Sequence, residues 1–413
     1  MNEKKTHWAA ATLATLTGLN LVNYLDRFLM PAMISPVEKE LGLNDDQFAT
    51  AVIAFMWGYF LTSPFFGYLG DRVSRKWLVA GGVLVWCLGT ALSGTAHSLL
   101  SLVLFRVLVG FGEASYATIS PGWIADLYPA ARRNNALTIF YVATSVGTAL
   151  GFILGGWMAV HFGWRAAFVC ASAPGVALVV ALVALPEPQR GASDAAGAAT
   201  PAPAAGLRVY AELLRYKSYL LVVAGYVAQT FAMGGFAVWA PAFLERHHHM
   251  NFDDADHFFG RSLIVAGLIS TLLGGFIATA WQRRHPAGYA WVLALSAALA
   301  APVVLAVFLV PDAGLAKVAL VASMFLLFLA TGPVNTLIIE TVPVAMRASA
   351  MAASIFAIHF FGDLWSPKIV GKLSVHFGNL QHAMVLTLPA AISVCAALWC
   401  WLAVRQTRAA RSG

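Results

Sequence analysis

Ionisable side chains stand inside several of the long apolar stretches of this 413-residue chain. Asp26 and Arg27 are adjacent in the first stretch, and Arg106 and Glu113 lie seven residues apart in a later one. Seven residues are about two helical turns, so Arg106 and Glu113 share one face of a helix. A charge at the bilayer centre costs about 2.5–3.5 kcal/mol on insertion scales, so such groups pair, line a cavity or carry a proton.

We therefore expect Asp26 and Glu113 to couple transport to protons, and Arg27 and Arg106 to bind an anionic part of a substrate. A static set of ion pairs that only locks helices together is the alternative. Tyr116, close behind Glu113 in the sequence, is expected to contribute to substrate binding.

A further pair lies near the other end of the chain. His359 and Asp363 are one helical turn apart, which places their side chains within mutual reach. We expect them to bind substrate together with the neighbouring Phe360. A buried histidine that only makes a structural hydrogen bond is the alternative interpretation.

The sequence contains twelve apolar runs of the length that crosses a membrane. A membrane-spanning helix takes about 20 predominantly apolar residues. The chain is 60% hydrophobic and 11% charged, whereas soluble domains carry about 25% charged residues. The sequence thus predicts an all-α membrane protein with apolar runs at 9–36, 47–69, 77–96, 99–121, 135–160, 164–186, 217–244, 259–281, 288–310, 315–340, 346–372 and 383–404.

The stretch 189–215 separates the sixth run from the seventh and is rich in Ala, Pro and Gly without periodicity. We predict an N-terminal six-helix bundle at 1–188, a flexible cytoplasmic linker at 189–215 and a C-terminal six-helix bundle at 216–413, with a central cavity. Of the 26 Lys and Arg residues, 17 fall in segments on the side of the termini and 7 on the other side. The positive-inside rule therefore predicts that both termini are cytoplasmic.

Charged residues gather in the loop 67–76, which reads GYLGDRVSRK. Asp71 lies there beside Arg72 and Arg75 at a helix end, where an acid can brace helices in one conformation and release them in another. We expect these three residues to act in gating. We expect the same of Glu340 and Arg347, which flank the loop between the tenth and eleventh runs.

Close helix contacts are predicted in the fifth run, where Gly147, Gly151 and Gly155 recur every fourth residue. This series serves either sliding of helices or static packing. The four cysteines lie in apolar runs without paired spacing, and we expect them to be buried.

Other classes of function are disfavoured. The loop 245–257 is rich in His and Asp but lacks the ligand spacing of zinc sites, so we expect no metal. No nucleophile or metalloenzyme motif is present, so we expect neither an enzyme nor a cofactor. The net charge of +7 comes from short loops, which excludes a nucleic-acid partner.

Four motifs resemble those of known transporters. The loop 67–76 resembles the G-x-L-x-D-R-x-G-R-K loop of the major facilitator superfamily, with Ser74 in place of the usual glycine. The segments 23–27 (N-Y-x-D-R), 105–116 (F-R-x-L-x-G-x-G-E-A-S-Y) and 359–367 (H-x-x-G-D-x-x-S-P) resemble the spinster family.

This resemblance implies the major facilitator fold and proton-linked transport of amphipathic lipids, such as lysophospholipids or sphingosine-like molecules. It also places Asp26, Arg27, Arg106 and Glu113 at the positions of the family's charges. We predict a lipid transporter that works by alternating access. A proton-coupled transporter of drugs or small organic solutes, with the same fold, is the alternative. We expect a monomer in a bacterial inner membrane, with protons and membrane lipid as its other partners.

Overall fold

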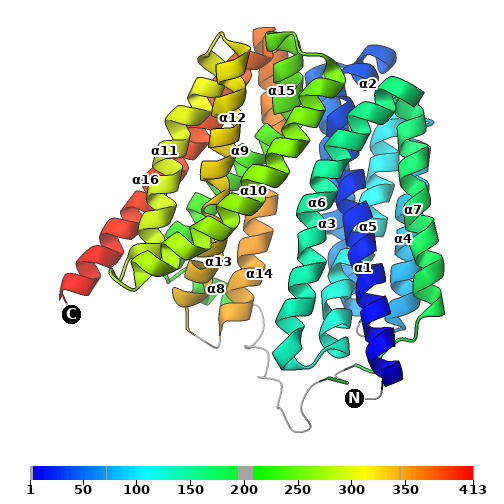
Figure 1. Cartoon of the computed structure of the whole chain (residues 1–413), viewed down its shortest axis with the longest axis horizontal. Helices are drawn as coiled ribbons and strands as arrows, with labels where there is room; N and C mark the ends of the chain where they lie inside the picture. Colours follow the sequence, from blue (N-terminus) through cyan, green and yellow to red (C-terminus); the bar gives the residue numbers. More distant parts are fainter. Residues whose placement is uncertain (1–2, 71, 191, 194–207, 344–345, 413) are drawn as a thin grey trace. The chain divides into compact units, whose positions relative to one another are not determined.

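The computed structural model describes residues 3–70, 72–190, 192–193, 208–343 and 346–412, and every regular element in these ranges is helical (Figure 1). Contacts between Cα atoms divide the chain into two compact units. Unit 1 comprises Met1–Ala198 with Asn251–Arg261, and unit 2 comprises Ala199–Met250 with Ser262–Gly413.

Unit 1 contains a series of long helices with one short turn and one short helix near its start. They are α1 (Glu3–Leu29), η1 (Pro31–Met33), α2 (Ile34–Leu41), α3 (Asp45–Gly70), α4 (Arg75–Ser93), α5 (Leu99–Leu127), α6 (Ala130–Phe162) and α7 (Trp164–Ala184). The first residues of α10 (Phe252–Gln282) also belong to this unit.

Unit 2 holds the rest of α10 and the remaining helices. They are α8 (Arg208–Leu213), α9 (Lys217–His248), α11 (Gly288–Leu309), α12 (Ala313–Phe328), α13 (Thr331–Glu340), α14 (Arg347–Ala357), the π-helix η3 (Ile358–Asp363), α15 (Ser366–Phe377) and α16 (Leu380–Ser412).

Ten helices in the described part of the chain are long and apolar enough to cross a membrane, counting α12 and α13 as one. The two other predicted runs are also helical but fall short of that criterion. In α1 the polar residues Asn20, Asn23 and Asp26 lower the hydropathy. The eleventh run is divided into α14, η3 and α15, each too short by itself.

The first run was predicted to continue to residue 36, and this boundary is wrong. The helix α1 ends at Leu29, and a 3₁₀ turn follows at Pro31–Met33 before α2 begins. Pro31 has no backbone N–H to continue the hydrogen-bond ladder of α1. Only the helix before Pro31, which is α1, is long enough to cross a membrane in this run.

The glycine series of the fifth run makes the close contact that its spacing predicts. A Cβ atom on Gly147 would lie 2.3 Å from the carbonyl oxygen of Leu21, and one on Gly151 would lie 2.7 Å from that of Leu25. The helices α1 and α6 consequently run side by side (Figure 1). This contact fixes the part of α1 that carries the buried charges.

The described residues at both ends of the predicted linker 189–215 contact the helical units. Arg190 donates to the carbonyl oxygens of Gly70 and Val73 at 2.9 and 2.6 Å. At the other end, Val209 and Leu213 of α8 are buried in the core of unit 2. Residues 191 and 194–207 lie outside the described residues.

All four cysteines are free, but they differ in exposure. Cys87 and Cys395 are buried and Cys400 is partly buried, as expected. Cys170 is exposed on α7, so the expectation of burial is wrong there. The outer face of a membrane helix is apolar, and a cysteine is compatible with it.

Candidate functional site

The helix α1 carries a fully buried carboxylate, that of Asp26. The indole Nε1 of Trp86 on α4 donates to Oδ2 of Asp26 at 2.5 Å, and the hydroxyl of Thr90 lies 3.4 Å from the same oxygen. The other oxygen, Oδ1, has no hydrogen-bond partner among the described residues. One side of this carboxylate is thus held by a donor, and the other side can accept a proton.

Next to Asp26, Arg27 forms an ion pair with Glu113 of α5. Its Nη2 lies 2.8 Å from Oε2 of Glu113, and the Glu113 side chain is fully buried. The Arg27 side chain is 18% exposed, which makes it the more accessible partner of the pair. Its guanidinium carbon lies 4.9 Å from the ring centroids of both Tyr24 and Phe55, so an aromatic surface adjoins the charge.

Arg106 is fully buried, and none of its three side-chain nitrogens has a hydrogen-bond partner in the part of the chain that the structure describes. Its guanidinium carbon lies 5.1 Å from the ring centroid of Phe55. It interacts electrostatically with Asp26, Glu113 and Arg27. A buried guanidinium without hydrogen bonds is costly, so Arg106 has unused capacity to bind a carboxylate or an anionic ligand.

Arg106 and Glu113 share α5 as predicted, but Glu113 pairs with Arg27 of α1 and not with Arg106. Asp26 contacts an indole and not an arginine. The four charged groups are therefore assembled from two helices, with α3 and α4 supplying the aromatic residues between and beside them.

Two glycines of α5 explain how the aromatic residues reach the charges. A Cβ atom on Gly110 would lie 1.8 Å from the carbonyl oxygen of Phe55, and one on Gly112 would lie 2.4 Å from the backbone nitrogen of Trp86. Gly110 therefore lets α3 approach α5, and Gly112 lets α4 approach it. The motif around Arg106 and Glu113 thus combines charges with the two contacts that position Phe55 and Trp86.

Tyr116 belongs to the packed core of unit 1. Its ring is 1% exposed, and its hydroxyl donates to the carbonyl oxygen of Leu16 at 2.7 Å. The hydroxyl is therefore already used to tie α5 to α1. This contact places Tyr116 in helix packing, and its role in substrate binding stays a prediction.

In unit 2, the predicted contact between His359 and Asp363 is confirmed. Nδ1 of His359 lies 2.9 Å from Oδ2 of Asp363, and the two side chains are 38% and 27% exposed. Both residues lie in the π-helix η3, where the amide of Leu364 donates to the carbonyl oxygen of His359. π-Helical turns are frequently found at functional sites.

The end of η3 and the first residue of α15 fit closely against α9. Phe360 is partly buried, and its ring stacks on Phe356 at 5.2 Å. A Cβ atom on Gly234 of α9 would lie 2.7 Å from Cβ of Asp363 and from Oγ of Ser366. This close approach seats the His359–Asp363 pair against α9.

The loop after α3 is braced by two carboxylates that the sequence did not predict, those of Asp126 and Glu187. The predicted gating residue Arg75 pairs with Asp126 at the end of α5. Glu187 accepts hydrogen bonds from the hydroxyl of Ser74 at 2.5 Å and from the backbone amide of Arg75 at 2.7 Å. A carboxylate thus caps the start of α4, and Ser74, which replaces the usual glycine, supplies a donor to it.

Two of the other expected gating residues, Arg72 and Glu340, have described side chains. Arg72 packs over the ring of Tyr68 and donates to its carbonyl oxygen at 3.1 Å. Glu340 is exposed at the last residue of α13. Asp71 and the side chain of Arg347 lie outside the described part of the structure.

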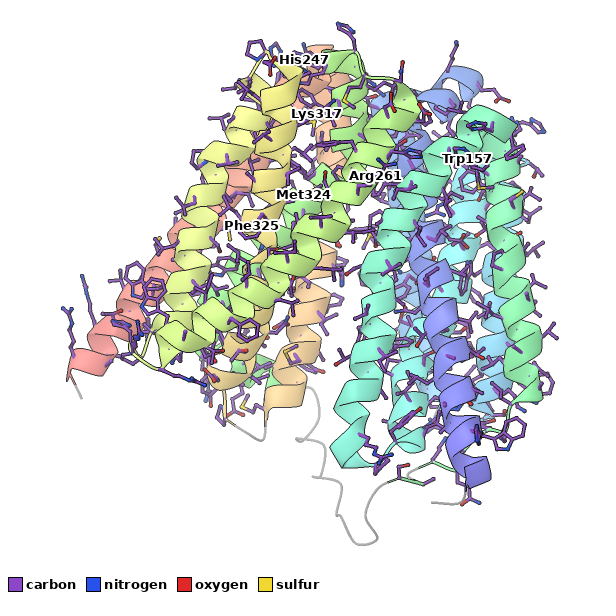
Figure 2. All side chains as sticks on the ribbon, viewed as in Figure 1. Trp157, His247, Arg261, Lys317, Met324 and Phe325 are labelled. Carbon is purple, nitrogen blue, oxygen red and sulfur yellow. The ribbon has the colours of Figure 1, made fainter. Side chains whose placement is uncertain are left out.

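Within the described residues, no group of three or more His, Cys, Asp or Glu side chains could hold a metal ion. His247 lies at the end of α9 (Figure 2), and its ring stacks on Phe243 at 5.0 Å. His247 and His248 therefore take part in aromatic packing.

A bundle of apolar helices with buried charges of both signs on facing helices is typical of a membrane transporter. Comparison with known proteins supports this class. Residues 16–367 match the Major Facilitator Superfamily. The chain is 31% identical over 374 residues to Protein spinster of Drosophila melanogaster, covering 88% of this chain and 61% of that protein.

It is also 32% identical over 391 residues to Protein spinster homolog 1 of Homo sapiens, covering 89% of this chain and 73% of that protein. Among solved structures, the fold is similar to a bacterial homolog of the human lysosomal transporter Spinster in an inward-facing, unoccupied conformation. That similarity has a TM-score of 0.83 at 23% identity and covers 98% of this chain and 97% of the other.

The chain is therefore an integral membrane transporter of the major facilitator superfamily and not an enzyme. Within that superfamily it belongs to the spinster family.

Proposed function

We propose that this protein is a proton-linked transporter of amphipathic lipids, such as lysophospholipids or sphingosine-like molecules. The observation that carries the proposal is the ion pair between the partly exposed Arg27 and the buried Glu113, with a second buried acid, Asp26, beside it. In this proposal the proton acts on Glu113 and an anionic headgroup acts on Arg27, the two members of one ion pair.

Protonation of Glu113 removes its charge and frees the guanidinium of Arg27 for an anionic group, such as the phosphate of a lysophospholipid. Deprotonation restores the competition and expels the headgroup. The rings of Tyr24, Phe55 and Tyr59 around Arg27 offer apolar surface next to the charge, which suits a molecule with a charged head and an apolar body. Arg106, with its unsatisfied nitrogens, is an alternative partner for Glu113 or for the headgroup.

The His359–Asp363 pair and Phe360 are proposed to contribute further contacts to substrate. We infer that the two six-helix halves exchange access by rocking, as in other transporters with two related halves. We also infer a bacterial inner membrane, a monomer, a linker at 189–215 and cytoplasmic termini, the last from the distribution of Lys and Arg. On that side, Arg72, Arg75, Asp71, Glu340 and Arg347 are proposed to act in gating.

Transport in proteoliposomes tests this proposal. Labelled lysophospholipid movement is measured with and without a proton gradient for wild type, Asp26→Asn and Glu113→Gln. Glu40→Gln is the matched control, because Glu40 lies on the short helix α2 and pairs with Arg165 of α7.

We expect the gradient to stimulate lipid movement in wild type and in the control, and we expect either site variant to lose the stimulation. Lipid movement that responds equally to the gradient in all four proteins would refute the proton role of Asp26 and Glu113. Absence of lipid movement in wild type, with movement of drugs or small organic solutes instead, would refute the lipid assignment.

A further inference from the structure

Trp86 has a feature that the transport proposal does not use. It is a large and fully buried side chain of unit 1, and its indole N–H makes the short hydrogen bond to Asp26. An indole is a donor only and cannot accept a proton from a carboxylic acid. Its contact with Oδ2 is therefore a fixed donor contact and not a proton relay.

We propose that Trp86 is a positioning residue of the proton site: its N–H holds Oδ2 of Asp26, so that Asp26 takes up its proton on Oδ1. This inference rests on the proposed proton role of Asp26. Oδ1 is buried and has no partner within the described ranges, so it is the oxygen that is available to a proton.

The hydrogen bond favours the ionised form of Asp26, because the N–H interacts more strongly with a carboxylate than with a neutral acid. Thr90 lies at a longer distance from the same oxygen and contributes less. The other groups that act on Asp26 are Glu113 and Arg106 from α5 and the thiol of Cys87 from α4. Trp86 is thus the side chain that orients the carboxylate of Asp26 without itself changing charge.

The backbone fixes Trp86 against this carboxylate. The close approach at Gly112 leaves no room between α5 and the backbone of Trp86. On its other side, the indole lies 6.1 Å from the ring of Tyr116, which is tied to α1 by its hydrogen bond to Leu16. Three helices therefore hold the donor in place while Asp26 gains or loses a proton.

The test is the pH dependence of gradient-driven transport in Trp86→Phe, which keeps an aromatic ring and removes the N–H. Trp123→Phe is the matched control. Trp123 is also fully buried in the core of unit 1, but its indole nitrogen has no hydrogen-bond partner among the residues described. Replacement of Trp86 by the benzothienyl analogue of tryptophan, which has sulfur in place of N–H, tests the same point with an unchanged shape.

We expect the midpoint of the pH profile to move to higher pH by about one unit in Trp86→Phe and in the benzothienyl variant, which is the size expected for one lost hydrogen bond to a carboxylate. The Trp123→Phe midpoint should stay at the wild-type value. In the Asp26→Asn background, Trp86→Phe should cause no further shift.

The outcomes distinguish the proton role of Asp26 from the positioning role of Trp86. A wild-type profile that Asp26→Asn leaves unchanged would refute the proton role of Asp26 in the proposed function. A wild-type profile that depends on Asp26 but keeps its midpoint in the benzothienyl variant would overturn the role of Trp86 alone. If Trp86→Phe fails to fold, the benzothienyl variant decides the question.

Discussion

Gly110 lies where α5 crosses α3, and its replacement by alanine tests how strongly the stability of the fold depends on that close crossing. A Cβ atom at this position would lie 1.8 Å from the carbonyl oxygen of Phe55 and 2.8 Å from the backbone nitrogen of Tyr59. Both neighbours are backbone atoms, which cannot rotate away as a side chain could. The helices must therefore separate before alanine can be accommodated.

The size of the effect follows from this geometry. Ordinary contact begins at 3.4 Å, so α3 has to move by about 1.6 Å. Overpacking costs about 1–3 kcal/mol, and contact with backbone places Gly110→Ala at the upper end. The higher helix propensity of alanine stabilises the fold by about 0.5–1 kcal/mol relative to glycine and offsets part of this cost. The net loss is about 2 kcal/mol, or about 4–8 °C in apparent Tm for a folding unit of roughly 200 residues.

Gly122 provides the matched control on the same helix. A Cβ atom there meets no atom within 4 Å, so Gly122→Ala gains only the helix propensity and should raise the apparent Tm by about 1–4 °C. The measurement is thermal unfolding in detergent at one fixed scan rate, because membrane proteins often unfold irreversibly. Equal shifts of the same sign in both variants would refute the reasoning.

Three further predictions concern residues around the site and the loops. Phe55→Leu removes the ring that both Arg27 and Arg106 contact and should raise the KM for transport several-fold. Phe55→Trp keeps an aromatic ring and should retain transport. Equal kinetics in both variants would contradict a role of the aromatic ring in the site. Glu187→Ala removes the carboxylate that caps α4, so hydrogen exchange of the first turn of α4 should become faster by a factor of about 5, and unchanged exchange would argue against the cap. The pKa of Glu40 is held below its usual 4.5, mainly by the hydrogen bond from Trp164 and to a smaller extent by that from Arg165. The ionised Glu40 therefore stabilises the fold fully above about pH 4.5, and this stabilisation is lost as the pH falls through the lowered pKa. The difference in apparent Tm between wild type and Glu40→Gln should therefore shrink below pH 4.5, and a constant difference from pH 6 to pH 3 would exclude this linkage.

Much of the fold could be predicted from the sequence because membrane helices leave a local signal. About 20 apolar residues in a row identify a span without reference to any other part of the chain. The same holds for the contact between His359 and Asp363, which are neighbours on one helix. The break at Pro31 was missed because apolar residues continue across it and hydropathy does not register the lost N–H.

The charged residues of the candidate site were identified from sequence alone, since an ionisable group in an apolar run stands out wherever it occurs. Their partners were not identified. Arg27 and Glu113 are 86 positions apart, and Asp26 and Trp86 are 60 apart, so no local pattern relates them. The roles of Phe55 and Trp86 were missed for the same reason, because aromatic residues are common in apolar helices.

Composition, helix positions and the identity of the buried charges are thus properties of the sequence itself, because each follows from the cost of placing a residue in lipid. Which charge pairs with which, which arginine keeps unsatisfied nitrogens and which oxygen of Asp26 is free were decided only by the tertiary structure. The physical reason is that these contacts depend on helix crossings at Gly110 and Gly112, where backbone meets backbone between segments that are distant in the chain.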